Sequence, residues 1–290
     1  LAADGQVVRA TGRSSADAPG VKGARMMMNV FDTNNRVCVA QRIINKKTNE
    51  ISVGYQMIED LDIAGSVVTA DAMNCQVGFV TSVISGGADY LISLKGNQDR
   101  SWKEAMHQFG RADESNIIER TYGPDLDHGR IEARTVSILP GRFLQADIWR
   151  KWPQLAGGSI VRVRRTIEVR STGRKTDEFS YYITSLPPFD CTADRIYEAV
   201  RGHWSVENNL HWVLDVHWGQ DRMQAKDPRY ISNRSALNKL ALALLENYRF
   251  WLWSKDAISS PDELSIKTLQ ARCGKPEVAL ECLAAGLGII

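Results

Sequence analysis

The chain has 290 residues, of which 43% are hydrophobic and 24% are charged, and its formal net charge is +2. These values are ordinary for a globular protein with a substantial core, so they exclude a disordered or fibrous chain. The net charge is too small to indicate nucleic-acid binding by itself, so any basic DNA-binding surface must be local. No apolar run reaches the roughly 18 residues of a membrane span, so we expect no membrane partner.

The cysteine pattern indicates free thiols. Five cysteines are spread over the chain without a CxxC pair, at Cys38, Cys75, Cys191, Cys273 and Cys282. An odd number at such spacings argues against a zinc ribbon and against a disulfide framework. We therefore expect reduced cysteines and a cytoplasmic protein.

The first third of the chain predicts a mixed α/β layer. The expected order is strand, strand, strand, helix, strand, helix, strand, over residues 1–5, 23–32, 36–45, 48–62, 65–72, 75–87 and 88–97. The fourth element begins with a possible helix cap at Thr48 or Asn49. Two acids, Asp4 and Asp71, are expected at strand ends. A strand at the first residues also suggests that an upstream segment precedes it.

The middle of the chain is richer in β-strand signals. Strand-like runs cover residues 130–139, 159–169 and 178–186, with a short helix expected at 101–110. Turn residues such as "YGPDLDHG" separate these runs. The second run carries Arg162, Arg164 and Arg165, which are typical either of a solvated strand face or of a DNA-binding surface. Helical patterns return at 192–216 and 232–253, with a weaker one near the end.

The stretch "HWSVENNLHWVLDVHW", residues 203–218, concentrates histidine, tryptophan and acids on one predicted helix. His203, Glu207, His211 and Asp215 recur every four residues and so form one stripe along it. We expect Trp204 and Trp212 to pack this helix onto the sheet. A zinc site from His203, Glu207 and His211 is an alternative, although the HExxH pattern is absent.

Asp4, Asp71 and Glu207 come from three different predicted elements. If they meet at one point, their charges repel one another unless a cation is present. Carboxylate oxygens are hard ligands that suit Mg²⁺ or Mn²⁺. The alternative for each acid at a strand end is a turn or cap residue.

Several motifs, in order, carry a resemblance to a known family. "ADGQVVR", "GADYLISLKGNQ", "DHGRIEARTV" and "HWSVENNLHWVLDV" resemble the DDE-type insertion-sequence transposases, and within them the H-repeat-associated group. The resemblance extends from about Ala3 to Leu245. It implies an RNase H-like α/β fold, a mixed sheet flanked by helices and interrupted by a β-rich insertion. The core would comprise residues 1–98 and 189–255, with the insertion at 99–188 and a tail of unknown role at 256–290.

The resemblance implies metal-dependent cleavage at the ends of an insertion element and strand transfer into target DNA. Asp4, Asp71 and Glu207 would be the catalytic acids and would hold two Mg²⁺ or Mn²⁺ ions. The implied partner is double-stranded DNA, bound by a homodimer in the nucleoid. Phosphate contacts are expected from five residues, each with a surface or capping role as the alternative: Lys95, Asn97, Arg201, His203 and His211. The two histidines are equally expected to support the acids.

The sequence also departs from the pattern of the family. Gln6 stands where relatives usually have lysine, and Gln220 stands where they usually have an acid. Val200, His203 and Leu214 occupy the places where the wider group has tyrosine, arginine and lysine around the glutamate. The alternatives are therefore an inactive DNA-binding remnant of a transposase and a metal-dependent nuclease of RNase H-like fold.

Overall fold

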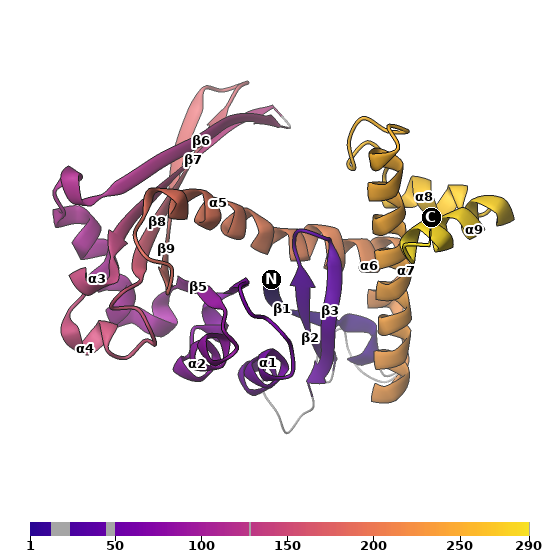
Figure 1. Ribbon diagram of the computed structural model, residues 1–290, viewed down its shortest axis with the longest axis horizontal. Coiled ribbons are helices and arrows are strands. Elements are labelled where there is room, and N and C mark those ends of the chain that lie inside the picture. The colour runs from indigo at the N-terminus through magenta and orange to yellow at the C-terminus, as the bar shows by residue number, and fades with distance from the viewer. Residues whose placement is uncertain (13–23, 45–49, 128, 290) are drawn as a thin grey trace. The chain divides into compact units, whose positions relative to one another are not determined.

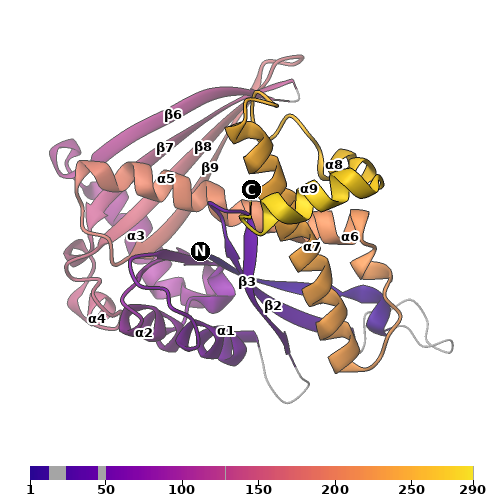
Figure 2. The same cartoon turned by 45° about the vertical axis from the view of Figure 1, so that its right-hand side comes forward.

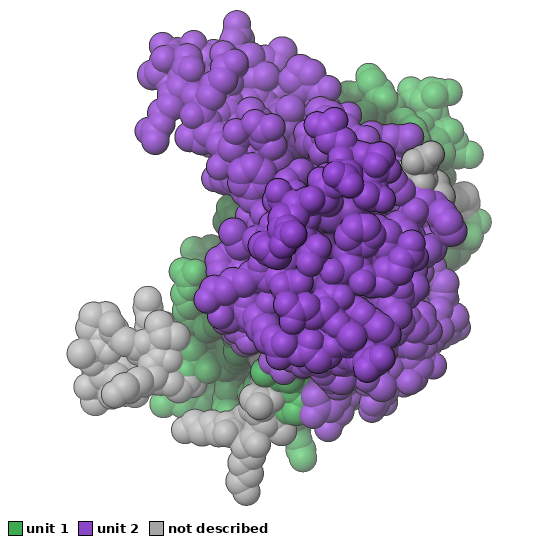
Figure 3. All heavy atoms as spheres, turned by 90° about the vertical axis from the view of Figure 1, so that its left-hand side faces the viewer, with its two compact units in different colours: residues 1–53, 202–290 green, residues 54–201 purple. Residues whose placement is uncertain are grey.

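The structure is a computed structural model that describes residues 1–12, 24–44, 50–127 and 129–289. The chain forms two compact units, coloured separately in Figure 3. The first unit comprises residues 1–53 and 202–290, and the second comprises residues 54–201. The possible helix cap at Thr48 or Asn49 and the side chain of Cys191 lie outside the described residues, whereas the other four cysteines are free thiols.

The first unit contains three antiparallel strands, β1 (Ala2–Val8), β2 (Arg25–Asp32) and β3 (Val37–Ile44), with β2 in the middle (Figure 1). The register places Asn29 of β2 opposite both Asp4 of β1 and Gln41 of β3. The prediction that Asp4 ends its strand is wrong. β1 continues for four residues because Gly5 to Val8 keep pairing with β2, and Gln6 occupies a buried polar position on it.

A long helical stretch carries the His-Trp motif. Helix α5 (Asp190–Ser205) continues into a π-helical segment, η6 (Val206–His211), and then into α6 (Trp212–His217). The expected packing of Trp204 and Trp212 is wrong, because these side chains are 60% and 56% exposed. The buried face is instead formed by smaller aliphatic side chains, Val206, Leu210, Val213 and Leu214. These lie at helical spacing and leave the tryptophans on the flanks.

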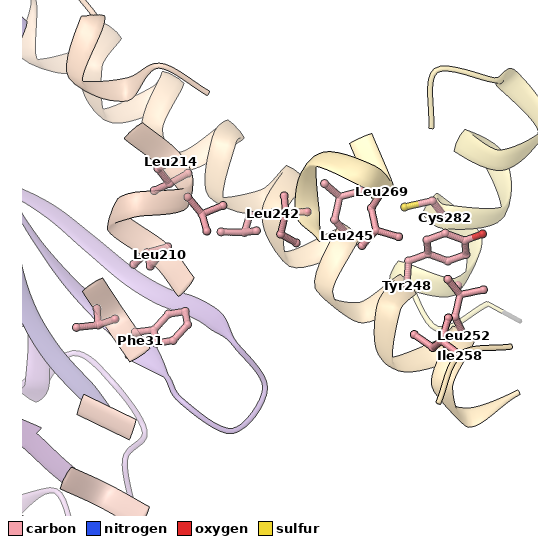
Figure 4. Close-up of a cluster of buried hydrophobic side chains, with 14 of the residues drawn as sticks. Phe31, Leu210, Leu214, Leu242, Leu245, Tyr248, Leu252, Ile258, Leu269 and Cys282 are labelled. Carbon is pink, nitrogen blue, oxygen red and sulfur yellow. The ribbon is translucent and has the colours of Figure 1, made fainter. Parts of the chain in front are cut away.

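The last three helices complete the core of the first unit. Helix α7 (Pro228–Ser254) begins where the Asp227 side chain accepts a hydrogen bond from the Arg229 backbone N–H, with proline in its first turn. Helices α8 (Ile266–Arg272) and α9 (Pro276–Gly286) lie beside α7 (Figure 2). The buried cluster of Figure 4 joins them through Leu245, Leu269 and Cys282. Helices α8 and α9 are thus a packed part of the fold.

The second unit is built on a mixed sheet. Strands β4 (Val67–Ala70) and β5 (Asp89–Leu94) are parallel and are connected through helix α2 (Val77–Ser85). The sheet continues antiparallel through β9 (Arg174–Thr184), β8 (Ser159–Val169), β7 (Arg130–Pro140) and β6 (Ile118–Asp127). Helices α1 (Glu50–Glu59), α3 (Asp99–Arg111) and α4 (Ala146–Trp149) complete the order of elements.

Most predicted elements are confirmed, including the order of the first seven. Strand β6 was missed because Gly123 and Pro124 interrupt it, and its pairing with β7 shifts between Tyr122 and Asp125. The arginine run of β8 is half-exposed or exposed and pairs with acids of neighbouring strands, with Arg164 Nη2 2.7 Å from Asp177. This arrangement favours the solvated strand face. None of the described helices is both long enough and apolar enough to span a bilayer.

Candidate active site

Asp4 lies in the middle of β1 and faces the helical stretch that follows α5. Its carboxylate Oδ2 is 3.6 Å from Nδ1 of His211, the last residue of η6. Both side chains are largely buried, with 20% of the Asp4 side chain and 12% of the His211 side chain exposed. This distance is longer than a hydrogen bond, so the contact is an electrostatic one between a carboxylate and the imidazole edge.

The other edge of the imidazole contacts the strand next to Asp4. His211 Nε2 lies 3.0 Å from Asn29 Nδ2, and Asn29 Oδ1 accepts a 2.5 Å hydrogen bond from Lys239 Nζ of α7. Lys239 also donates to Gln41 Oε1 at 2.6 Å, and Gln41 in turn donates to the Ser232 carbonyl. A continuous line of polar contacts therefore connects α7 to Asp4 through the strands of the first unit.

Burial changes the protonation of two groups in this line. It lowers the pKa of His211 to about 4, with a further contribution from the positive charge of Lys239. Burial also lowers the pKa of Lys239 to about 8. At neutral pH the imidazole is therefore neutral, with one donor and one acceptor nitrogen, while most Lys239 side chains remain charged.

Glu207 lies in the same π-helical segment as His211, and its side chain is exposed. Segment η6 packs against β1, the strand of Asp4. The π geometry is visible where the Trp212 N–H donates to the Glu207 carbonyl, five residues earlier. Such segments are rare and occur often at functional sites. Within the first unit, the strand of one predicted catalytic acid thus contacts the helical segment of another.

Gln6 and Gln220, the two residues expected to depart from the family pattern, contact each other. Gln220 Nε2 donates a 2.7 Å hydrogen bond to Gln6 Oε1, and these residues are only 1% and 4% exposed. Gln6 Nε2 donates to Asp215 Oδ1 at 3.1 Å, and Ser235 Oγ donates to Gln220 Oε1 at 3.2 Å. Burial and the nearby charge of Asp221 raise the pKa of Asp215 to about 6. The pair is a satisfied polar contact in the core.

Asp71 is in the second unit and directly follows β4, as predicted. Its Oδ1 accepts hydrogen bonds from the backbone and side-chain nitrogens of Asn74, at 3.2 and 3.1 Å. The Asn97 amide donates to the Ala72 carbonyl, and Gln98 Nε2 donates to the Cys75 carbonyl at 2.8 Å. The "KGNQ" segment after β5 therefore holds the loop that carries Asp71.

The remaining predicted DNA contacts lie at the surface or partly buried. Lys95 is exposed at the end of β5. Arg201 is exposed, with Nη1 3.2 Å from Asp125 and its guanidinium over the ring of Tyr197. His203 is half-buried in the last turn of α5. Two other positions that differ from the wider group, Val200 and Leu214, are buried core residues.

A pocket beside α6 was not predicted from the sequence. Its volume is about 770 Å³, and its lining includes Arg222, Arg234, His217, Trp218 and Tyr230. All of its residues belong to the first unit. In the part of the chain that the structure describes, no carboxylate pairs with either arginine. His217 and Trp218 end the stretch 203–218, but no sequence pattern indicated that Arg222 and Arg234 would lie beside them.

The donor set of the predicted metal site can be compared with what Mg²⁺ requires. Among the described residues, no three His, Cys, Asp or Glu side chains are grouped closely enough to hold a metal ion. The chemistry of Asp4, Asp71 and Glu207 nevertheless fits a hard cation, because each offers only carboxylate oxygen. His211 is a poor ligand here, since Asn29 Nδ2 lies against its Nε2. The residues therefore favour magnesium or manganese over zinc.

Comparison with known proteins identifies the family. The family described as "Transposase DDE domain" matches residues 1–244. The putative protein YbfL and the H repeat-associated putative transposase YhhI, both of Escherichia coli (strain K12), are each 30% identical over 250 residues, 85% of this chain and 64% of theirs. The putative transposase YncI of Escherichia coli O157:H7 is 29% identical over 255 residues, 84% of this chain and 63% of its own. The chain thus spans less than two thirds of the length of these relatives. The resemblance seen in the motifs is confirmed, and the chain belongs to the family of transposase DDE domains.

Proposed function

We propose that the protein cleaves DNA at the ends of an insertion element and joins the freed strand to target DNA, in a reaction that requires divalent metal. Membership of the transposase family supports this proposal. The observation that carries it is the position of Asp4, whose strand packs against the π-helical segment bearing Glu207. A carboxylate half-buried at the centre of a strand stabilises the fold poorly and so favours a role in chemistry.

In the proposed site, Asp4, Asp71 and Glu207 hold two Mg²⁺ or Mn²⁺ ions. When bound, such ions lower the pKa of an attacking water and stabilise the leaving oxygen. The protein supplies positioning, because the carboxylates come from a strand, a loop fixed by hydrogen bonds and a packed helix. Asn97 contributes by holding the Asp71 loop through the Ala72 carbonyl.

DNA is the proposed partner, and its phosphates would be contacted by basic and polar side chains. Lys95, Arg201 and His203 are the proposed phosphate contacts, together with the amide of Asn97 and the edge of His211. The pocket beside α6 adds Arg222 and Arg234, with Trp218 and Tyr230 as aromatic walls. Arginines with no nearby carboxylate attract phosphate, and aromatic rings stack on bases. Two element ends must be paired for transposition, so we propose that a homodimer forms on DNA.

The first test is Mn²⁺ binding measured by calorimetry on the whole chain, alone and with a short DNA duplex. We expect binding by the wild type and its loss in Asp4→Asn, Asp71→Asn and Glu207→Gln. Glu198→Gln is the matched control, because Glu198 is an exposed acid of the same helical stretch, more than two turns before Glu207. Binding that is equal in all variants, with DNA present, contradicts the proposed metal site.

The second test is nicking of supercoiled plasmid in Mn²⁺. A nuclease or transposase core converts the plasmid to the open-circular form, and each of the three acid variants stops this conversion while Glu198→Gln does not. Joining of a labelled 3′-hydroxyl end to the plasmid separates transposition from simple hydrolysis. Metal binding and DNA binding without nicking or joining indicate the inactive remnant instead.

A further inference from the structure

Lys239 is a lysine in the core of the first unit. It is 5% exposed and lies on the face of α7 that packs against the strands. In the described chain no carboxylate pairs with its ammonium group, which instead contacts Asn29 Oδ1, Gln41 Oε1 and the sulfur of Met27. Burying a cation without a counter-charge costs free energy, so packing alone does not explain a lysine at position 239.

The ammonium determines the orientation of the Asn29 amide. Lysine Nζ has only donors, so the oxygen of Asn29 must face it and the amide nitrogen must face the other way. That nitrogen lies 3.0 Å from His211 Nε2. Since Asn29 Nδ2 is a donor, Nε2 must be the acceptor of the ring, and the proton of the neutral imidazole must be on Nδ1. Nδ1 is the atom that faces Asp4.

We propose that Lys239, acting through Asn29, fixes the tautomer of His211 that presents its N–H to the carboxylate of Asp4. Lys239, Asn29 and His211 are then positioning residues for Asp4. The line is rigid because its members come from α7, β2 and η6, and β2 pairs directly with β1 at Asp4. The tautomer follows from the contacts alone, whereas its effect on metal binding rests on the proposed function.

The consequence concerns the carboxylate of Asp4. An N–H facing one oxygen of the Asp4 carboxylate favours one rotamer of the side chain, which prepares the acid to bind a cation. Partners that orient a ligand in this way typically change metal affinity by about 10–100-fold when they are removed. A polar line with a purely structural role would change stability on mutation and leave metal affinity per folded molecule unchanged.

The tautomer is tested by NMR of the ¹⁵N-labelled whole chain, because two-bond ¹H–¹⁵N spectra distinguish the protonated from the unprotonated ring nitrogen. His211→Gln assigns the signal among the five histidines. We expect the His211 proton on Nδ1 in the wild type and in Lys267→Met, a control at an exposed lysine of α8. In Lys239→Met the preference for Nδ1 should be lost. A wild-type ring with its proton on Nε2 overturns the inference, even if every variant fails to fold.

The effect on Asp4 is tested with two His211 variants. Asparagine keeps an N–H near the place of Nδ1, whereas glutamine reaches the place of Nε2 and presents no N–H to Asp4 from the place of Nδ1. We expect His211→Gln to weaken Mn²⁺ binding about 10–100-fold and His211→Asn to retain most of it, with melting curves confirming that both fold. Equal affinities in folded variants overturn the positioning role. Absence of metal binding in the wild type contradicts the proposed function instead, and leaves the tautomer to the NMR result.

Discussion

Gln6 and Gln220 show how two unusual residues can be explained together. Each is expected to depart from the family pattern, and they lie 214 positions apart in the chain, yet their side chains share one buried hydrogen bond. A lysine and an acid at these positions would form an ion pair in the same place. Two amides keep the geometry without the cost of removing two charges from water. Their contact therefore gives the two residues one structural explanation, a hydrogen-bonded polar pair in the core.

This interpretation predicts that mutations of Gln6 and Gln220 have coupled effects on the free energy of unfolding. Gln220→Glu alone places a buried acid against Gln6, which already donates to Asp215, and we expect it to lower the free energy of unfolding by about 3–5 kcal/mol. Adding Gln6→Lys should restore a large part of this loss. Urea unfolding of the two single variants, the double variant and the wild type gives the coupling free energy. Strictly additive effects would show that the two positions do not act together.

The raised pKa of Asp215 predicts that the stability of the protein depends on pH. Its pKa is raised to about 6 in the folded chain, from an ordinary value of 3.8, because of burial and the charge of Asp221. Between these values the folded state binds more protons than the unfolded state, so the contribution of Asp215 to stability falls as pH rises. The free energy of unfolding of the wild type relative to Asp215→Asn should therefore decrease from about pH 4 to pH 6 and then level off. If urea unfolding gives parallel curves of free energy against pH for the wild type and Asp215→Asn, the raised pKa of Asp215 is contradicted.

At the scale of elements, the helical motif shows what spacing can predict. A four-residue repeat placed His211 and Asp215 on one face, and the structure directs both toward β1, to Asp4 and Gln6. The same repeat could not identify Asn29 or Lys239, because these come from elements joined only by tertiary packing. In retrospect, Lys239 within "NKLALALL" breaks an apolar helix pattern, which is the one local signal of the buried line.

Other predictions were wrong or incomplete, each for a physical reason. Trp204 and Trp212 were expected inside because indole is apolar, but the helix has a complete aliphatic face without them. Asp4 was expected at a strand end because acids are rare within strands, and this preference failed at a proposed functional position. Strand β6 contains Pro124, which lacks the N–H that a ladder requires.

Two adjacent glycines before β8 give a prediction about the second unit. A Cβ added at Gly158 would lie 2.2 Å from the Thr184 carbonyl oxygen, whereas at Gly157 the nearest atom is 4.0 Å away. The contact at Gly158 is with backbone of β9, which cannot move without disturbing the sheet. We expect Gly158→Ala to destabilise the protein by at least about 1–3 kcal/mol. Gly157→Ala should be close to neutral in the same thermal unfolding experiment, and equal effects would contradict the close approach.

At the scale of the whole molecule, the charges are almost balanced. The net charge of +2 gives little long-range attraction for DNA, and much of the positive charge of β8 is neutralised by acids such as Asp177 and Glu132. In the proposed DNA complex, affinity would then come from described cations that are not paired with a carboxylate. In the first unit, the described arginines that meet this condition include Arg222 and Arg234 of the pocket beside α6.

Salt dependence distinguishes such contacts from general attraction. Each phosphate contact to duplex DNA contributes about 0.9 to the slope of log affinity against log salt concentration. We expect Arg222→Ala with Arg234→Ala to reduce that slope by almost 2 in fluorescence anisotropy titrations of a short duplex, and to weaken binding more at low salt than at high salt. Arg229→Ala is the control, because Arg229 is exposed in the first turn of α7 outside the pocket lining. An unchanged slope would exclude the pocket as a phosphate site. The slope is the deciding quantity, because a change of shape alone lowers the affinity without removing the two phosphate contacts.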